Sequence, residues 1–171
     1  MLNKGDILIL SDIEKDIINL IASKRQSNKV KSKLDGKGQA NNKKGIYNNK
    51  LGFAGEFLFC KHFNLFPDFT ICNTSKILKT DNGDALLFNK TVDVKTSCNE
   101  QYLMTPKYSK SNIELYAKFY LDKKNAEFVF QGFATNKMLF NIKNLKTKFE
   151  KYLTVDSYVL NTNQLLNYNQ L

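Results

Sequence analysis

The first part of the chain alternates between apolar and polar residues with the period of a helix. A capping-box pattern at residues 11–14 predicts that a helix begins there and runs over residues 12–25. The apolar positions expected to form its core-facing stripe are Ile13, Ile17, Leu20 and Ile21. Residues 51–63 are apolar around most of a helical circumference, which predicts a second, largely buried helix with Glu56 in its middle.

Between these two helices, residues 26–50 are rich in Lys, Asn, Gly and Ser and contain few apolar anchors. Such a segment buries too little surface to offset the entropy of ordering it, so we expect a mobile basic loop. Two interpretations stay open: an arm that follows a phosphate backbone, or a solvated linker.

The second half of the chain contains short apolar runs that are typical of strands. They lie near residue 70 and at residues 85–88, 91–96, 113–121, 127–134 and 158–160. Residues 122–125 suit a hairpin loop, Thr135 or Asn136 suits the cap of a short helix through Phe140, and residues 161–168 suit a final helix. The pattern predicts an α/β (α+β) fold with a central mixed sheet flanked by helices, in a single domain over residues 1–171.

Composition points to an anionic partner. The chain has 26 Lys and Arg against 16 Asp and Glu, a net charge of +10, and nucleic acid is the first polyanion to consider. Solubility, or the codon usage of an AT-rich genome, would explain the same charge. No stretch approaches the ~20 apolar residues of a membrane span, so we expect a cytoplasmic protein, in a bacterial cell or a phage-infected host, with no membrane partner.

The cysteines and the histidine exclude several kinds of site. Cys60, Cys72 and Cys98 are widely spaced without a C-x-x-C pair, which argues against a disulfide framework or a zinc ribbon and predicts reduced, mostly buried thiols. His62 is the only histidine, so the chain cannot form an H-N-H metal site or a paired-histidine phosphodiesterase site.

The candidate chemistry lies in residues 83–95, which read as two strands joined by an Asn89-Lys90 turn. This register places Phe88 opposite Thr91, Leu86 opposite Asp93 and Asp84 opposite Lys95. Asp84, Asp93 and Lys95 then project from one face. The opposite face carries the apolar side chains Ala85, Leu87, Val92 and Val94.

Two carboxylates crowded on one face are costly unless they bind a cation or pair with the lysine. Carboxylate oxygens from Asp84 and Asp93 suit Mg²⁺ or Mn²⁺, which keep water ligands and complete their shell with substrate phosphate oxygens. Lys95 would orient the attacking water or help to deprotonate it.

These residues resemble the PD-(D/E)XK nuclease superfamily, in which an Asp opens one strand and D-x-K or E-x-K lies on the next. The resemblance spans residues 51–134 and rests on Asp84, on Asp93-Val94-Lys95 and on Glu56 in the preceding helix; Gly83 stands where the family has Pro. It implies a restriction-endonuclease-like αβββαβ core and a Mg²⁺-dependent deoxyribonuclease whose products carry 5′-phosphates. The implied metal ligands are Asp84, Asp93, Glu56 and the Val94 carbonyl.

Other functions stay open. A non-catalytic DNA-binding protein could keep this fold, a Holliday-junction resolvase would share the chemistry as a homodimer, and an assembly protein would use the basic surface for a protein partner. Candidate nucleic-acid contacts follow the site along the chain: Tyr102, Lys107, Tyr108, Lys110 and Lys118. Most aromatic residues of the 113–121 strand are expected to pack in the core.

Overall fold

Two β-sheets and three α-helices make up the part of the chain that the computed structural model describes, which is residues 1–31, 43–69, 71, 83–109, 112–147 and 155–171. In chain order, with η for a 3-10 turn, the elements are β1 (Ile7–Leu8), α1 (Asp12–Lys31), α2 (Lys43–His62), β2 (Ala85–Leu87), β3 (Lys90–Ser97), β4 (Tyr102–Pro106), η1 (Lys107–Ser109), β5 (Leu115–Asp122), β6 (Glu127–Thr135), α3 (Asn136–Leu139), η2 (Ile142–Asn144), β7 (Leu145–Lys146), β8 (Ser157–Asn161), η3 (Thr162–Gln164) and η4 (Tyr168–Gln170).

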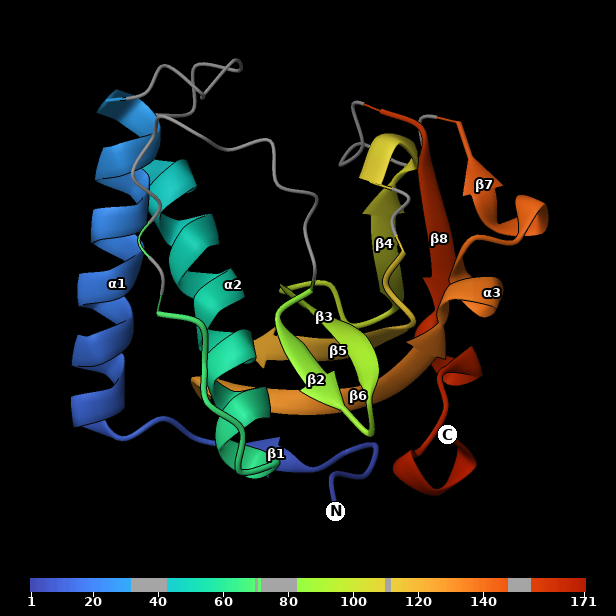
Figure 1. Ribbon diagram of the computed structural model, residues 1–171, viewed down its shortest axis with the longest axis horizontal. Helices are drawn as coiled ribbons and strands as arrows, with labels where there is room; N and C mark the ends of the chain where they lie inside the picture. Colours follow the sequence, from blue (N-terminus) through green and yellow to red (C-terminus); the bar gives the residue numbers. More distant parts are fainter. Residues whose placement is uncertain (32–42, 70, 72–82, 110–111, 148–154) are drawn as a thin grey trace.

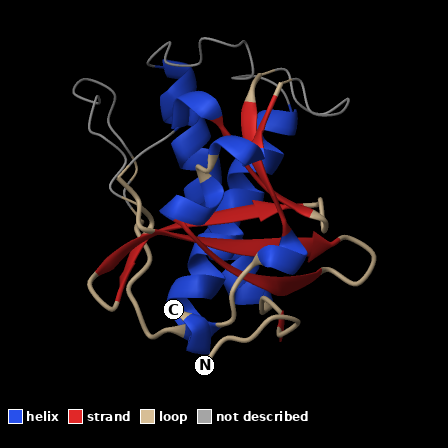
Figure 2. Cartoon of the chain, turned by 90° about the vertical axis from the view of Figure 1, so that its right-hand side faces the viewer, coloured by secondary structure: helices blue, strands red, loops and turns tan. Residues whose placement is uncertain are grey.

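The larger sheet has the strand order β1-β6-β5-β3-β2 and is mixed, because β3 pairs parallel with β5 while its other pairings are antiparallel. The smaller sheet has the order β4-β8-β7. Figure 1 shows α1 and α2 side by side on one flank and the smaller sheet with α3 on the other. Seen from that second flank, the strands of the smaller sheet run across those of the larger one (Figure 2).

The two faces of the larger sheet bury separate cores. One core joins α1 and α2 to the sheet and includes Phe53, Phe59, Val92, Val94 and Phe119. The other core joins the opposite face to the smaller sheet and α3; its buried residues are Leu103, Ile113, Tyr116, Ala134, Leu139, Phe140, Tyr158, Leu160 and Leu165. β3 therefore lies between two packed layers, and a charged side chain on it needs a local partner.

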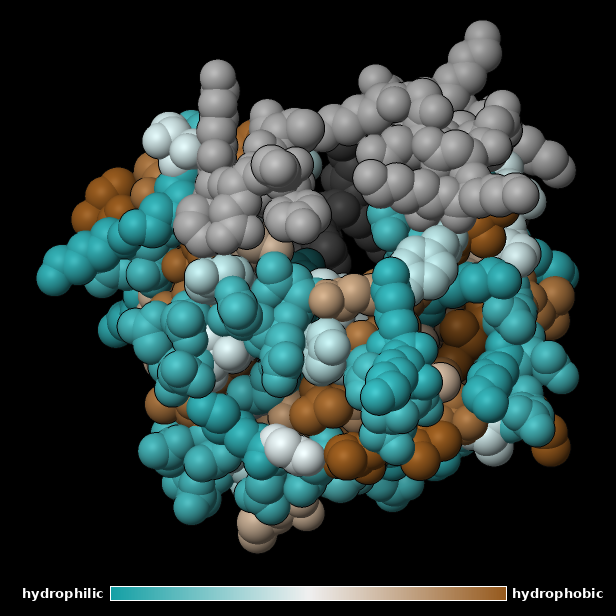
Figure 3. All heavy atoms as spheres, turned by 180° about the vertical axis from the view of Figure 1, so that it is seen from behind, coloured by the Kyte–Doolittle hydropathy of each residue, from teal (hydrophilic) through white to brown (hydrophobic). Residues whose placement is uncertain are grey.

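Apolar side chains also reach the surface. Seen from behind, the molecule is mostly hydrophilic, with apolar groups in the lower middle of that face and others near its edges (Figure 3). The most exposed large apolar side chains in the described chain include Phe66 at 86% and Ile13 and Ile142 at 74% each. Contiguous exposed apolar groups indicate binding surfaces more often than isolated ones do.

The predicted start of α1 is confirmed, but the predicted core face is wrong. The Ser11 backbone N–H donates to Glu14 Oε2 at 2.8 Å, and Ser11 Oγ accepts from the Glu14 N–H, which is the expected capping box. Ile18, Ala22 and Gln26 are buried. In the predicted stripe Ile13, Ile17 and Leu20 are exposed, and Ile21 alone packs against the core. Apolar residues occur around much of this helix, so periodicity alone does not select the face on which it packs.

The expected loop over residues 26–50 is wrong at both ends. α1 continues to Lys31 and α2 begins at Lys43, so only residues 32–42 of that loop lie outside the described chain. Gln26 is 5% exposed and accepts a hydrogen bond from the Asn49 amide of α2. Packing between the two helices therefore stabilises polar sequence in a helical conformation, which a composition argument does not anticipate.

The predicted fold class, an α+β domain with a mixed sheet and helices, is confirmed. The strands expected at residues 85–88, 91–96, 113–121, 127–134 and 158–160 are present, and Thr135 caps α3 by accepting from the Met138 N–H. The helix expected at residues 161–168 is wrong, since η3 and η4 are 3-10 turns. Between β3 and β5 lie β4 and η1, where the αβββαβ order has a helix, and the run near residue 70 falls outside the described chain.

Close packing of α2 on β3 predicts opposite effects for two glycines of the same helix. A Cβ at Gly55 would lie 1.9 Å from Thr96 Oγ1 and 3.1 Å from Thr96 Cβ, whereas one at Gly52 would have its nearest neighbour at 4.0 Å. Gly55→Ala is expected to destabilise the fold by roughly 1–3 kcal/mol through overpacking. Gly52→Ala, the matched control, is expected to stabilise it by roughly 0.5–1 kcal/mol through helix propensity. Urea unfolding measures both, and equal stabilisation by the two changes would contradict this packing.

Candidate active site

The hairpin of β2 and β3 positions the predicted acidic residues, with a turn one residue earlier than expected. Phe88 and Asn89 have φ angles of 51° and 59°, which make them the two central residues of a type I′ turn. The observed pairs are Leu87 with Lys90, Leu86 with Thr91 and Ala85 with Val92, so the predicted pairs of Asp84 with Lys95 and Leu86 with Asp93 are wrong.

The register differs from the predicted one by two residues, a full strand period, so each side chain keeps its predicted face. Continued by one position, the observed register places Asp84 opposite Asp93. On the other face Leu87, Val92 and Val94 are buried, as predicted. The correction therefore brings the two carboxylates closer together.

Gly83 sets the position of Asp84 at the start of β2. Its φ is +86°, and a Cβ there would lie 2.8 Å from the Val92 carbonyl oxygen. Proline cannot adopt this φ, which is the physical reason that glycine precedes the aspartate here. The Asp84 N–H donates to the same Val92 oxygen at 2.7 Å, so the backbone of the two strands fixes the aspartate against β3.

The Asp84 carboxylate is held between the backbone of β3 and a second acid. Its Oδ2 accepts from the Val94 N–H at 2.7 Å. Burial raises the pKa of Asp84 to about 8, and the nearby charges of Glu56 and Asp93 and a side-chain hydrogen bond with Asp93 act in the same direction. The Val94 N–H opposes this shift because it stabilises the ionised form. The raised pKa of Asp84 favours its protonated form at neutral pH.

Asp93 and Lys95 form an ion pair on β3. Lys95 Nζ lies 2.6 Å from Asp93 Oδ2, and Asp93 is 9% exposed while the Lys95 side chain is 35% exposed. Residues two apart on a strand share a face, so D-x-K geometry brings the ammonium to the carboxylate without any strain in the backbone. The ammonium stays accessible enough to meet an incoming anion or water.

Glu56 joins the cluster from α2, held by a partner that the sequence did not suggest. Glu56 Oε2 lies 3.3 Å from the Arg25 guanidinium of α1. Lys61, on the same helix as Glu56, pairs with Glu14 at 2.6 Å. Burial raises the pKa of Glu56, Arg25 lowers it, and the charge of Asp93 raises it again, so Glu56 is electrostatically part of the same site.

Cys60, one turn further along α2, faces the same acids. It is fully buried, and burial raises the pKa of its thiol to about 11, with the negative charges of Asp84 and Glu56 adding to the effect. Its neutral thiol agrees with the predicted reduced, buried cysteine. Cys98, by contrast, is exposed and also free, and Cys72 lies outside the described chain.

Arg25 is the residue that sequence reasoning missed. It is the only arginine in the chain, lies on α1, donates to the Asp68 carbonyl, and stands 4.6 Å from the centre of the Phe53 ring. A guanidinium can bind a carboxylate, a carbonyl and an aromatic face together, which an ammonium does less well. The one feature of the sequence that could have drawn attention to Arg25 is that it is a single arginine among 25 lysines.

The donor set fits a hard divalent cation with water ligands. Three carboxylates, Glu56, Asp84 and Asp93, face two cationic side chains, Arg25 and Lys95, so the cluster is anionic when every group is charged. Among the described residues, no group of three or more His, Cys, Asp or Glu side chains converges closely enough to hold a metal ion alone. Mg²⁺ needs only one or two carboxylates because waters and phosphate oxygens complete its shell, and Asp84 with Asp93 meets that requirement.

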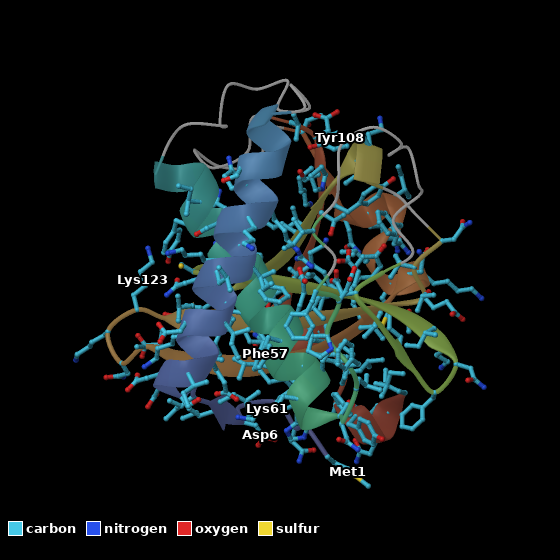
Figure 4. The ribbon with its side chains drawn as sticks, turned by 60° about the vertical axis from the view of Figure 1, so that its left-hand side comes forward. Met1, Asp6, Phe57, Lys61, Tyr108 and Lys123 are labelled. Atoms are coloured by element: carbon cyan, nitrogen blue, oxygen red, sulfur yellow. The ribbon has the colours of Figure 1, made fainter. Side chains whose placement is uncertain are left out.

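The predicted nucleic-acid contacts are scattered. Tyr108 is 71% exposed on η1, at the opposite end of the molecule from Lys61 on α2 (Figure 4). Tyr102 is half-buried on β4, Lys107 is exposed, and Lys110 lies outside the described chain. Lys118 cannot contact a backbone as expected: it is 1% exposed, its ammonium contacts Ser97 Oγ, and burial lowers its pKa to about 8.

Comparison with known proteins finds no matching family model, no matching curated protein and no matching solved structure. No helix in the described residues is both long and apolar enough to cross a membrane. The interpretation of the acidic cluster therefore depends on its own geometry and chemistry.

Proposed function

We propose that this protein is a metal-dependent nuclease that hydrolyses DNA phosphodiester bonds, with Asp84, Asp93, Lys95 and Glu56 as its site. The observation that carries the proposal is that Asp84, next in the hairpin register to Asp93, accepts from the Val94 N–H at 2.7 Å, while Lys95 lies 2.6 Å from Asp93. Two adjacent, largely buried acids with a flanking lysine are costly for stability, and such arrangements cluster at functional sites.

Each side chain has a distinct role in this proposal. Asp84 and Asp93 hold Mg²⁺ or Mn²⁺, with Glu56 and the Val94 carbonyl as further candidate ligands. When bound, the cation lowers the pKa of a water molecule and stabilises negative charge on the phosphate. Lys95 positions the attacking water and supplies a second positive centre, and Arg25 holds Glu56 in place from the adjacent helix.

The proposed partner is DNA, which the net charge of +10 would attract, and the proposed location is the cytoplasm. Action as a homodimer stays a prediction. The exposed face of α1, with Ile13, Ile17 and Leu20, is a described surface on which pairing would bury apolar side chains.

Metal removal is the direct test. The purified protein is expected to cut supercoiled plasmid or a labelled single strand with Mg²⁺ or Mn²⁺, and to stop completely when EDTA is added, because the proposed mechanism activates the attacking water through the bound cation. Gel electrophoresis follows the products, and an equally purified Asp93→Asn sample controls for contaminating nucleases. Salt-sensitive DNA binding without any cutting would favour the non-catalytic binding protein instead. Absence of both binding and cutting would refute a nucleic-acid function.

A further inference from the structure

A pocket of about 410 Å³ lies beside Asp84, and most of its lining is apolar. The lining residues are Leu65, Phe66, Gly83, Asp84, Ala85 and Leu86. The volume falls within the range of roughly 300–1,000 Å³ that small-ligand sites occupy. Asp84 lines the pocket and also belongs to the acidic cluster, so a group bound in the pocket would lie next to the reacting phosphate.

Two walls of this pocket are apolar side chains that remain open to solvent. Phe66 is 86% exposed and Leu86 is 63% exposed, although both line the same pocket as Asp84. The Phe66 ring packs edge-on against Phe69 at 5.4 Å, and Phe69 packs edge-on against Phe53 of α2 at 5.9 Å. The ring is thus supported from the core side while most of its surface stays available to a ligand.

We propose that this pocket binds an unpaired nucleobase against Phe66, which makes single-stranded or locally unpaired nucleic acid the substrate class; the proposal rests on the nuclease function above. The net charge of +10 selects for a polyanion, and a nucleic-acid strand combines phosphates with flat, weakly polar faces that fit an aromatic wall. A simple inorganic polyanion or an acidic peptide offers no such faces.

Duplex DNA cannot place the face of a base against Phe66. In a duplex the base faces are stacked on one another and only their edges are accessible in the grooves. A base can enter a pocket beside the scissile phosphate only from a single strand, a frayed end or a flipped-out position. The location of the pocket at Asp84 therefore selects against continuous duplex.

Binding measured without metal separates this proposal from catalysis. Fluorescence anisotropy compares a short oligothymidine, the same oligomer with its bases removed, and a duplex of equal length, all in EDTA. The wild type is expected to bind the intact oligomer about 5- to 100-fold more tightly than the abasic one, the scale of stacking one base on an aromatic ring. Phe66→Ala is expected to remove that difference and leave abasic binding unchanged, Phe66→Tyr to retain it, and Ile142→Ala, a control at another highly exposed apolar residue, to change nothing.

The possible outcomes are distinct. Loss of base preference in Phe66→Ala, and a weaker loss in Leu86→Ala, would support the pocket even if the protein never cuts. Equal binding of intact and abasic oligomers by the wild type, tighter binding of duplex, or loss of base preference in Tyr108→Ala but not in Phe66→Ala, would overturn it, even if metal-dependent cutting is established. Thermal unfolding checks that each variant is folded.

Discussion

Asp93→Asn is expected to lower metal-dependent cleavage by about 10³-fold or more while leaving the fold intact. The change removes a negative charge from the acid that faces Asp84 and pairs with Lys95, but it keeps the shape of the side chain. Loss of one preorganised electrostatic contact lowers enzymatic rates by about 10²–10³-fold, and loss of a metal ligand adds weaker metal binding. Single-turnover cleavage and calorimetric titration with Mn²⁺ measure the two effects separately.

Lys95→Gln separates the roles of the two partners. It is expected to lower the cleavage rate on a similar scale while Mn²⁺ binding is kept, because both carboxylates remain. Lys61→Gln is the matched control, since Lys61 also forms a 2.6 Å ion pair, but with Glu14 of α1 and not with an acid of the cluster. If Lys61→Gln slowed cleavage as strongly as Lys95→Gln, or if Asp93→Asn cut at the wild-type rate, the assigned site would be wrong.

The sequence predicted the acidic cluster well because strand periodicity is robust. A two-residue error in the hairpin register still left Asp84 and Asp93 on the predicted face and the apolar residues in the core. The error itself came from the turn. Phe88 occupies a left-handed conformation that a bulky residue rarely adopts. Its ring packs against Tyr168, with ring centres 5.5 Å apart, and Tyr168 is 80 residues further along the chain, so local sequence could not indicate this contact.

Tertiary contacts decided what the sequence did not reveal. Arg25 reaches Glu56 because α1 packs against α2, a contact that no local pattern in the sequence reveals. The smaller sheet was missed as a unit because β7 has only two residues, and because the buried face of β4 includes the polar Thr105, so its hydropathy does not follow its alternating burial. The face on which α1 packs depends on Ala22, whose small side chain allows close approach, rather than on the larger exposed residues.

Asp84→Asn is expected to abolish cleavage and, in the metal-free protein, to raise the melting temperature. The pKa of Asp84 is about 8 in the folded state against 3.8 for an unperturbed aspartate, so between these values the folded state holds a proton that the unfolded state has released. The stability that this group contributes is therefore full below pH 3.8 and is lost as the pH rises toward 8. Asparagine keeps an oxygen for the Val94 N–H but carries no charge to desolvate.

The gain in melting temperature should consequently grow with pH between the two pKa values. Near pH 8, the upper of the two values, we expect Asp84→Asn to melt several degrees above the wild type. In a chain of this size, about 1 kcal/mol of unfolding free energy corresponds to roughly 2–4 °C in melting temperature. Asp16→Asn, an exposed position on α1, should show no such trend. Adding Mg²⁺ should raise the melting temperature of the wild type more than that of Asp84→Asn, because ion binding stabilises only a protein that keeps its ligands. A variant that melts lower than the wild type at every pH would mean that Asp84 serves the fold rather than a cation, because its charge would then be satisfied by the protein alone.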